Sequence, residues 1–144
     1  MLKRASIVRR IDDLGRIVIP KEIRRTMRIR ESDPLKIFTG HEGEIILKKY
    51  SPIGEMSTFA RQYAESLAQV SGHVAMIADR DQFIAVSQDF PEEFVHQAIC
   101  PIICEGDVIG AVILVDNDAK GKMGEVEQKL IQSAAGFLGR QMEQ

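Results

Sequence analysis

The sequence lacks several features that would place it in a familiar functional class. Only two of its 144 residues are cysteines, both late in the chain, so a disulfide framework is not expected. No apolar run approaches the roughly 20 residues that span a bilayer. The N-terminal stretch MLKRASIVRR has no apolar signal-peptide core. We therefore expect a cytoplasmic, reduced protein without a membrane partner.

Side chains that could bind a metal or act as nucleophiles are also few. Cys100 and Cys104, with His96 four residues earlier, invite a metal interpretation, but no fourth ligand lies nearby and structural zinc almost always takes four. The apolar run around them favours a buried strand in which cysteine acts as a small hydrophobe. Nothing electropositive surrounds either thiol in sequence, so a lowered pKa has no visible cause.

The remaining titratable candidates are typical of structural positions. His41 is expected at a hairpin tip and His73 at the start of a strand, while Asp79 and Asp81 suit a turn. No nucleophile, base and orienting group come together. The sequence therefore predicts no enzyme, no metal and no cofactor.

What the sequence does have is a sharp division of charge. Residues 1–50 contain thirteen Lys plus Arg and seven Asp plus Glu, a net +6, whereas residues 51–144 contain six and fourteen, a net −8. A short basic module joined to an acidic one predicts a nucleic-acid-binding segment attached to a second domain.

The basic module is expected to form short strands with one short helix. The strand candidates are residues 5–11 and 16–19 around a turn at Gly15, followed by a helix over 21–27 behind Pro20 and a hairpin over 35–39 and 44–49. Some fifty residues lie near the lower limit for independent folding, and so short a helix is unstable alone. We therefore predict an obligate homodimer that shares its core through this segment.

The rest of the chain follows a linker at 50–54 and has a different pattern. Helical spacing of apolar residues predicts amphipathic helices over 55–70 and 124–142. Between them we expect strands over 73–78, 83–87, 99–104 and 108–115, helical turns over 91–97 and a polar loop over 117–124. This is an α+β pattern with an antiparallel sheet. The predicted domains are 1–53, for DNA binding and dimerisation, and 54–144, to which the family resemblance given below assigns regulation and oligomerisation.

Paired arginines are the strongest candidate for recognition. Guanidinium groups stay charged and fit phosphate oxygens bidentately. An alternative is a plain solvated charged face, offset by Asp12, Asp13 and Glu22. The predicted DNA-binding residues, which strand ends, turn and helix could bring to one surface, are Arg9, Arg10, Arg16, Arg24 and Arg25.

Two groups of segments carry a family resemblance. IVRRIDDLGRIVIPKEIRRTMRIRESDPLKIF, followed by EGEIILKKYSPI, resembles the AbrB-type transition-state regulators of spore-forming bacteria. HVAMIADRDQFIAVS, GDVIGAVILVDND and MGEVEQKLIQSAAGFLGRQMEQ resemble the C-terminal half of sporulation regulators in that family. The resemblance implies a swapped-hairpin dimeric β-barrel and a GAF-like domain that pairs dimers into a homotetramer.

The resemblance also implies a function. It implies a nucleoid-associated transcription factor that binds double-stranded, A/T-rich promoter DNA with limited sequence consensus. The family's DNA-contacting arginines fall on Arg9, Arg16, Arg24 and Arg25, and Arg10 holds a basic position beside them.

One departure bears on ligand sensing. The family's GAF-like domain has a longer central section, whereas only residues 88–98 bridge the second and third strands here. The shortening argues against a ligand pocket and a small-molecule effector, and favours self-association. Two alternatives remain: an antitoxin-like protein-interaction module, and a GAF-type ligand or redox sensor.

Overall fold

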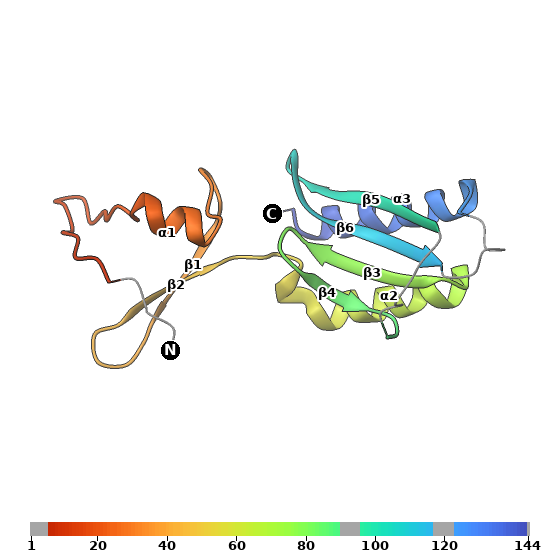
Figure 1. The fold of residues 1–144 in the computed structure, drawn as a ribbon, viewed down its shortest axis with the longest axis horizontal. Coiled ribbons are helices and arrows are strands. Elements are labelled where there is room, and N and C mark those ends of the chain that lie inside the picture. The colour runs from red at the N-terminus through yellow and green to blue at the C-terminus, as the bar shows by residue number, and fades with distance from the viewer. Residues whose placement is uncertain (1–5, 90–95, 117–122, 144) are drawn as a thin grey trace. The chain divides into compact units, whose positions relative to one another are not determined.

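The chain folds into two compact units. The structure, a computed structural model, describes residues 6–89, 96–116 and 123–143 (Figure 1). Unit 1 is Met1–Tyr50 and unit 2 is Ser51–Gln144. The division lies three residues before the predicted boundary, because Ile53 is fully buried in the core of unit 2. The fold class is α+β.

Unit 1 contains one short helix and one hairpin. Helix α1, Lys21–Thr26, begins directly after Pro20, whose fixed φ and missing N–H suit a helix start. Strands β1, Leu35–Thr39, and β2, Ile45–Lys49, pair antiparallel, with Leu35 opposite Lys49 and Thr39 opposite Ile45. The predicted helix and hairpin are confirmed.

The two strands predicted before α1 do not form within the single chain. Residues 6–11 and 16–19 have no regular secondary structure, although the turn between them is present. In that turn the Asp12 N–H donates to the Arg16 carbonyl at 3.0 Å, and Gly15 takes the φ of +76° that favours glycine. A strand needs a hydrogen-bonded neighbour, and among the described residues no other segment pairs with these two as a strand. The prediction of strands was therefore wrong for the isolated chain.

Unit 2 is a four-stranded antiparallel sheet with two helices. Its strand order is β4-β3-β6-β5, and all neighbouring strands are antiparallel. The elements are a 3₁₀ turn η1, Gly54–Met56, helices α2, Ser57–Ser71, and α3, Glu125–Gln141, and strands β3, Val74–Asp79, β4, Phe83–Val86, β5, His96–Cys104, and β6, Asp107–Asp116. Both predicted helices and all four predicted strands are confirmed.

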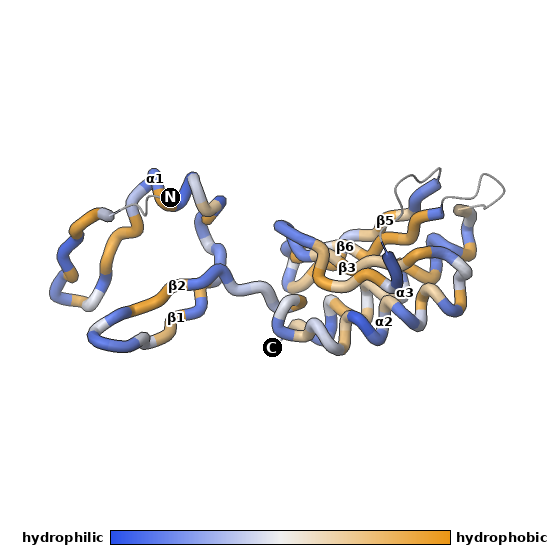
Figure 2. Tube along the Cα trace, turned by 60° about the horizontal axis from the view of Figure 1, so that its bottom comes forward, coloured by the Kyte–Doolittle hydropathy of each residue, from blue (hydrophilic) through white to orange (hydrophobic). Residues whose placement is uncertain are grey.

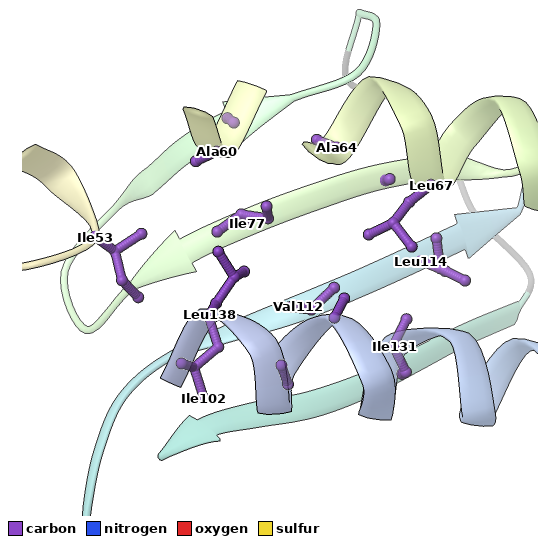
Figure 3. Packing of buried hydrophobic residues seen from close by; sticks show 14 of the residues in the cluster. Ile53, Ala60, Ala64, Leu67, Ile77, Ile102, Val112, Leu114, Ile131 and Leu138 are labelled. Atoms are coloured by element: carbon purple, nitrogen blue, oxygen red, sulfur yellow. The ribbon is translucent and has the colours of Figure 1, made fainter. Parts of the chain in front are cut away.

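The core of unit 2 lies between the helices and one face of the sheet. Helix α2 packs on β3 and β4, and α3 packs on β5 and β6. Side chains from both helices point toward the sheet, where Leu67 and Leu138 meet Ile77 and Val112 (Figure 3). Apolar residues three and four apart create this buried stripe on each helix. Gly139 lets α3 approach β5 closely, because a Cβ there would overlap the Ile103 carbonyl.

Some predicted segments fall partly outside the described residues. The helical turns predicted over 91–97 cannot be compared for residues 91–95, while His96 and Gln97 already belong to β5. The predicted loop over 117–124 is likewise outside the description for residues 117–122. Within the described part of the chain, no helix is long and apolar enough to cross a membrane.

Candidate nucleic-acid interface

All five predicted DNA-binding arginines are exposed in unit 1. Arg9 and Arg10 lie in the segment before the turn, and Arg16 follows the turn. Arg24 and Arg25 occupy the last turn of α1, where cations also interact favourably with the helix dipole.

The turn fixes the position of Arg16. Asp12 Oδ1 accepts hydrogen bonds from the N–H groups of Leu14, at 2.9 Å, and Arg16, at 2.8 Å. Asp12 Oδ2 accepts the Nε–H of Arg16 at 2.7 Å, which forms an ion pair. Hydrogen bonds from the Arg16 backbone and then from its side chain, with a smaller one from Leu14, hold the pKa of Asp12 below its ordinary value.

Arg24 is attached to the same framework from the helix side. Its Nε–H donates to the carbonyl oxygen of Ile19 at 3.0 Å. Arg9 lines an apolar groove together with Ile17, Val18 and other residues, so it lies against the segment that leads into α1. Arg9, Arg16 and Arg24 are thus all related to residues 17–19. Arg9 lines a groove with this segment, Arg24 bonds to its last residue, and Arg16 directly precedes it. That all five arginines border one surface stays a prediction.

The groove beside these arginines is open and apolar. It has a volume of about 500 Å³ and is lined by Ile7, Val8, Arg9, Ile17, Val18, Ile19, Pro20, Ile23, Ile45 and Leu47. Hydrophobic residues recur along the open segments of unit 1 (Figure 2). None of the described residues 6–50 is buried. Val8 is 89% exposed, which is unusual for a valine in a folded module.

Sequence reasoning missed two contributors in this unit. Asp12 was treated as a turn residue and an offsetting charge, although its spacing of four from Arg16 across a tight turn was a usable signal. On the hairpin, Lys36 and Lys48 stand opposite each other, and their ammonium groups lie 5.3 and 5.7 Å from the ring centre of Phe38. Such cation–π contacts order basic side chains at a surface.

The histidine and cysteines of unit 2 do not form a second site. His96, Cys100 and Cys104 follow one another along β5 at intervals of four residues, about 13 Å in a strand, which is too far for a shared metal. Burial raises the pKa of Cys100. Burial, with smaller contributions from Glu105, Glu143 and Asp107, raises the pKa of Cys104. Both thiols are therefore less reactive than a free cysteine.

His73 has a structural environment at one end of the sheet. Its Nδ1 lies 3.3 Å from Asp116 Oδ2, and its Nε2 lies 3.6 Å from Glu127 Oε1. The imidazole is 10% exposed and links the start of β3 to the end of β6 and the first turn of α3. Among the described residues, no group of three or more histidine, cysteine or acidic side chains has an arrangement that could hold a metal ion.

Two protein families match this chain, and their matches meet at residue 55, close to residue 50, after which the net charge changes sign. The family described as "Stage V sporulation protein T C-terminal, transcription factor" matches residues 55–99 and 88–143. The family described as "Antidote-toxin recognition MazE, bacterial antitoxin" matches residues 8–55. The two C-terminal matches overlap on this chain over residues 88–99.

Individual relatives give the same picture. Stage V sporulation protein T of Bacillus subtilis (strain 168) is 45% identical over 180 aligned positions, which cover 99% of this chain and all of that protein. The alignment is longer than the 144 residues of this chain, in agreement with a shortened central section. The transition state regulatory protein AbrB of the same organism is 55% identical over 51 residues, which are 35% of this chain and 52% of that protein.

A third relative, the putative transition state regulator Abh of Bacillus subtilis (strain 168), is 34% identical over 82 residues, which are 53% of this chain and 88% of that protein. The resemblance inferred from the arginine-rich motif and from the C-terminal segments is thereby confirmed. With a full-length relative at 45% identity and a C-terminal family match from residue 55 to 143, the chain belongs to the stage V sporulation protein T family of AbrB-type transcription regulators.

Proposed function

We propose that the protein regulates sporulation or transition-state genes by binding promoter DNA as a dimer of its basic units. The observation that carries the proposal is the incomplete state of unit 1. It exposes five arginines, and it also leaves every described apolar side chain at least partly exposed. A module with no buried residue of its own needs a second copy to complete a core.

The proposed dimer is a swapped-hairpin barrel. Residues 6–11 and 16–19 have strand-forming sequences, and they have no partner strand within the part of the chain that the structure describes. Pairing them with the same segments of a second copy would satisfy their backbone groups and fill the apolar groove. A dimer would also double the arginines to ten and present them from both sides of a two-fold axis.

The proposed DNA contact relies on phosphates and groove shape. Unit 1 carries a net +6 charge, which attracts the duplex whatever its sequence. Arg9, Arg10, Arg16, Arg24 and Arg25 would bind phosphate oxygens or enter a narrow minor groove. A preference for A/T-rich promoters fits this mode, because A-tracts narrow that groove and deepen its negative potential.

Unit 2 is proposed to be a shortened GAF-like domain that promotes higher assembly rather than ligand sensing. Its helices carry an aromatic cluster, in which Phe137 stacks on Phe59 at 6.0 Å and lies 5.9 Å from Tyr63. Phe137 is 42% exposed, so the cluster offers an apolar surface for pairing dimers into a tetramer. We propose a cytoplasmic, nucleoid-associated protein without enzymatic activity. An antitoxin role is less well supported, since the antitoxin-type match ends at residue 55 and a folded unit follows.

The salt dependence of DNA binding tests the proposal. If about eight phosphates are neutralised per dimer, the slope of log K against log salt should be near −7. Arg25→Ala should weaken binding to an A/T-rich and a G/C-rich duplex alike and make the slope less steep by about two, one contact per protomer. Fluorescence anisotropy at several salt concentrations measures both quantities.

Arg140→Ala provides the matched control, because Arg140 is an exposed arginine at the end of α3 in unit 2. It should leave the slope unchanged. A slope near zero for the unmodified protein, or an equal effect of Arg140→Ala and Arg25→Ala, would contradict the arginine surface.

A further inference from the structure

Asp12 has an unusual number of roles for an exposed acidic residue in a basic module. Its Oδ1 accepts two backbone N–H groups and thereby closes the turn, with distances of 2.9 and 2.8 Å. Its Oδ2 accepts the Nε–H of Arg16 at 2.7 Å. Turn geometry and the direction of the arginine side chain therefore depend on one carboxylate.

The pairing uses only part of the Arg16 guanidinium. A guanidinium has five N–H donors, and the bond to Asp12 uses the single one on Nε. The Arg16 side chain is 70% exposed, so its two terminal nitrogens are accessible to solvent. They can form the two parallel hydrogen bonds that phosphate oxygens accept.

Arg24 is also held through its Nε–H group, so the arrangement occurs twice in unit 1. Its Nε–H donates to the carbonyl oxygen of Ile19, and its terminal nitrogens remain at an exposed position. Both arginines are thus fixed at Nε. An arginine held in this way loses less side-chain freedom when it binds a phosphate.

We infer that Asp12 is a positioning residue, which holds Arg16 with its terminal nitrogens available for a DNA phosphate. The inference rests on the proposed function. By charge alone, a carboxylate near the duplex should weaken DNA binding, so its removal should raise the affinity. If positioning dominates, removal of this negative charge weakens binding.

Asp13 supplies a matched control from the next position in the chain. It is exposed, has the same charge and takes part in none of the hydrogen bonds of the turn described above. Asp12→Asn retains an Oδ1 acceptor for the turn but places an amide donor opposite the Nε–H of Arg16. Asp13→Asn removes the same charge one residue further along the chain and leaves the pair between Asp12 and Arg16 intact.

The experiment compares the DNA affinity of five proteins at about 0.1 M salt, where charges roughly 10 Å from the duplex still act. They are the unmodified full chain, Asp12→Asn, Asp13→Asn, Arg16→Ala and the double variant Arg16→Ala with Asp12→Asn. Asp12→Asn should weaken binding about fivefold per dimer, as expected for loss of a charged hydrogen bond in each protomer, whereas Asp13→Asn should strengthen it about twofold. In an Arg16→Ala background, Asp12→Asn should have no weakening effect, because its partner is already absent.

Three results separate the possibilities. Equal or tighter binding by Asp12→Asn would overturn the inference while leaving the DNA-binding function intact. Equal weakening with and without Arg16 would also overturn it, because Asp12 would then act only through the turn or through folding. Failure of the unmodified protein to bind DNA with a steep salt slope would overturn the proposed function and the inference with it.

Discussion

The two units of this chain differ in where their apolar side chains lie. Among the residues that the structure describes, all 17 buried hydrophobic ones fall at Ile53 or later, in unit 2. Unit 1 has large apolar residues at comparable frequency, but every one that the structure describes is at least partly exposed. A hydrophobic sequence therefore does not by itself produce a core. Unit 2 completes its core within one chain, whereas unit 1 provides only part of one.

The largest expected effect comes from a pair of valines with the same exposure. Val18 in unit 1 is 70% exposed, and Val126 at the start of α3 in unit 2 is 69% exposed. Val18→Asp should place a charge in the core of the proposed dimer, prevent unit 1 from folding and weaken DNA binding by more than about 100-fold. Val126→Asp should change stability by less than about 0.5 kcal/mol, since aspartate is tolerated at a helix N-terminus.

Circular dichroism, sedimentation and DNA titration of both variants check this prediction. In the Val18→Asp protein, the thermal transition of unit 2 should persist. Similar behaviour of the two variants would mean that Val18 stays in water, and the difference between the units would then have no consequence for assembly.

A pair of glycines in α3 tests how tightly unit 2 is packed. A Cβ on Gly139 would overlap the Ile103 carbonyl of β5, whereas a Cβ on Gly136 would meet no atom within 4 Å. Gly139→Ala should therefore destabilise unit 2 by about 2 kcal/mol, since it forces the helix away from the sheet. Gly136→Ala should stabilise it by up to about 1 kcal/mol, the ordinary preference of a helix for alanine.

Urea denaturation followed by far-UV circular dichroism measures both free energies of unfolding. The two variants add the same methyl group to the same helix, three residues apart, so helix propensity cancels between them. A stabilising effect of Gly139→Ala would mean that α3 and β5 do not approach as closely as described.

The comparison of the units also explains what the sequence could predict. In unit 2, helical and strand periodicity were sufficient, because each element packs against others in the same chain. The end of the helical turns predicted over 91–97 was an exception, since His96 and Gln97 belong to β5. In unit 1, the helix start after Pro20 and the hairpin could also be predicted, because both are determined by local backbone chemistry.

The two strands expected before α1 could not be judged from local sequence. Their apolar residues indicated strands, but strand formation depends on a partner strand, and the described residues of the single chain supply none. The five arginines are predicted as DNA contacts from charge and from family resemblance, whereas the bond between Asp12 and Arg16 required the turn geometry. An acidic residue among arginines is easily counted only as an offset to their charge, although Asp12 also accepts a hydrogen bond from one of them, Arg16.

The smallest effect concerns the first turn of α3, where unit 2 has a charged contact to compare with Asp12 in unit 1. Glu127 Oε2 accepts the N–H of Gly124 at 3.0 Å, and its Oε1 lies 3.6 Å from His73 Nε2. Hydrogen bonds from the backbone of Glu127 and then of Gly124, with a smaller contribution from His73, lower the pKa of Glu127. Because its folded-state pKa lies below the ordinary value of 4.5, its stabilisation is complete above that pH and is lost as the pH falls through the lowered pKa.

Glu127→Gln should consequently lower the Tm of unit 2 at pH 7 by an amount on the order of 2 °C, and the difference from the unmodified side chain should shrink toward pH 3. Glu125→Gln removes an equal charge from the same helix terminus, where the carboxylate pairs with Lys129 at 3.1 Å on the surface, and should have a smaller effect. Measuring both in the Val18→Asp background isolates the transition of unit 2. A Tm difference for Glu127→Gln that matched Glu125→Gln, or that grew at low pH, would assign the effect to general helix-terminal charge rather than to this cap.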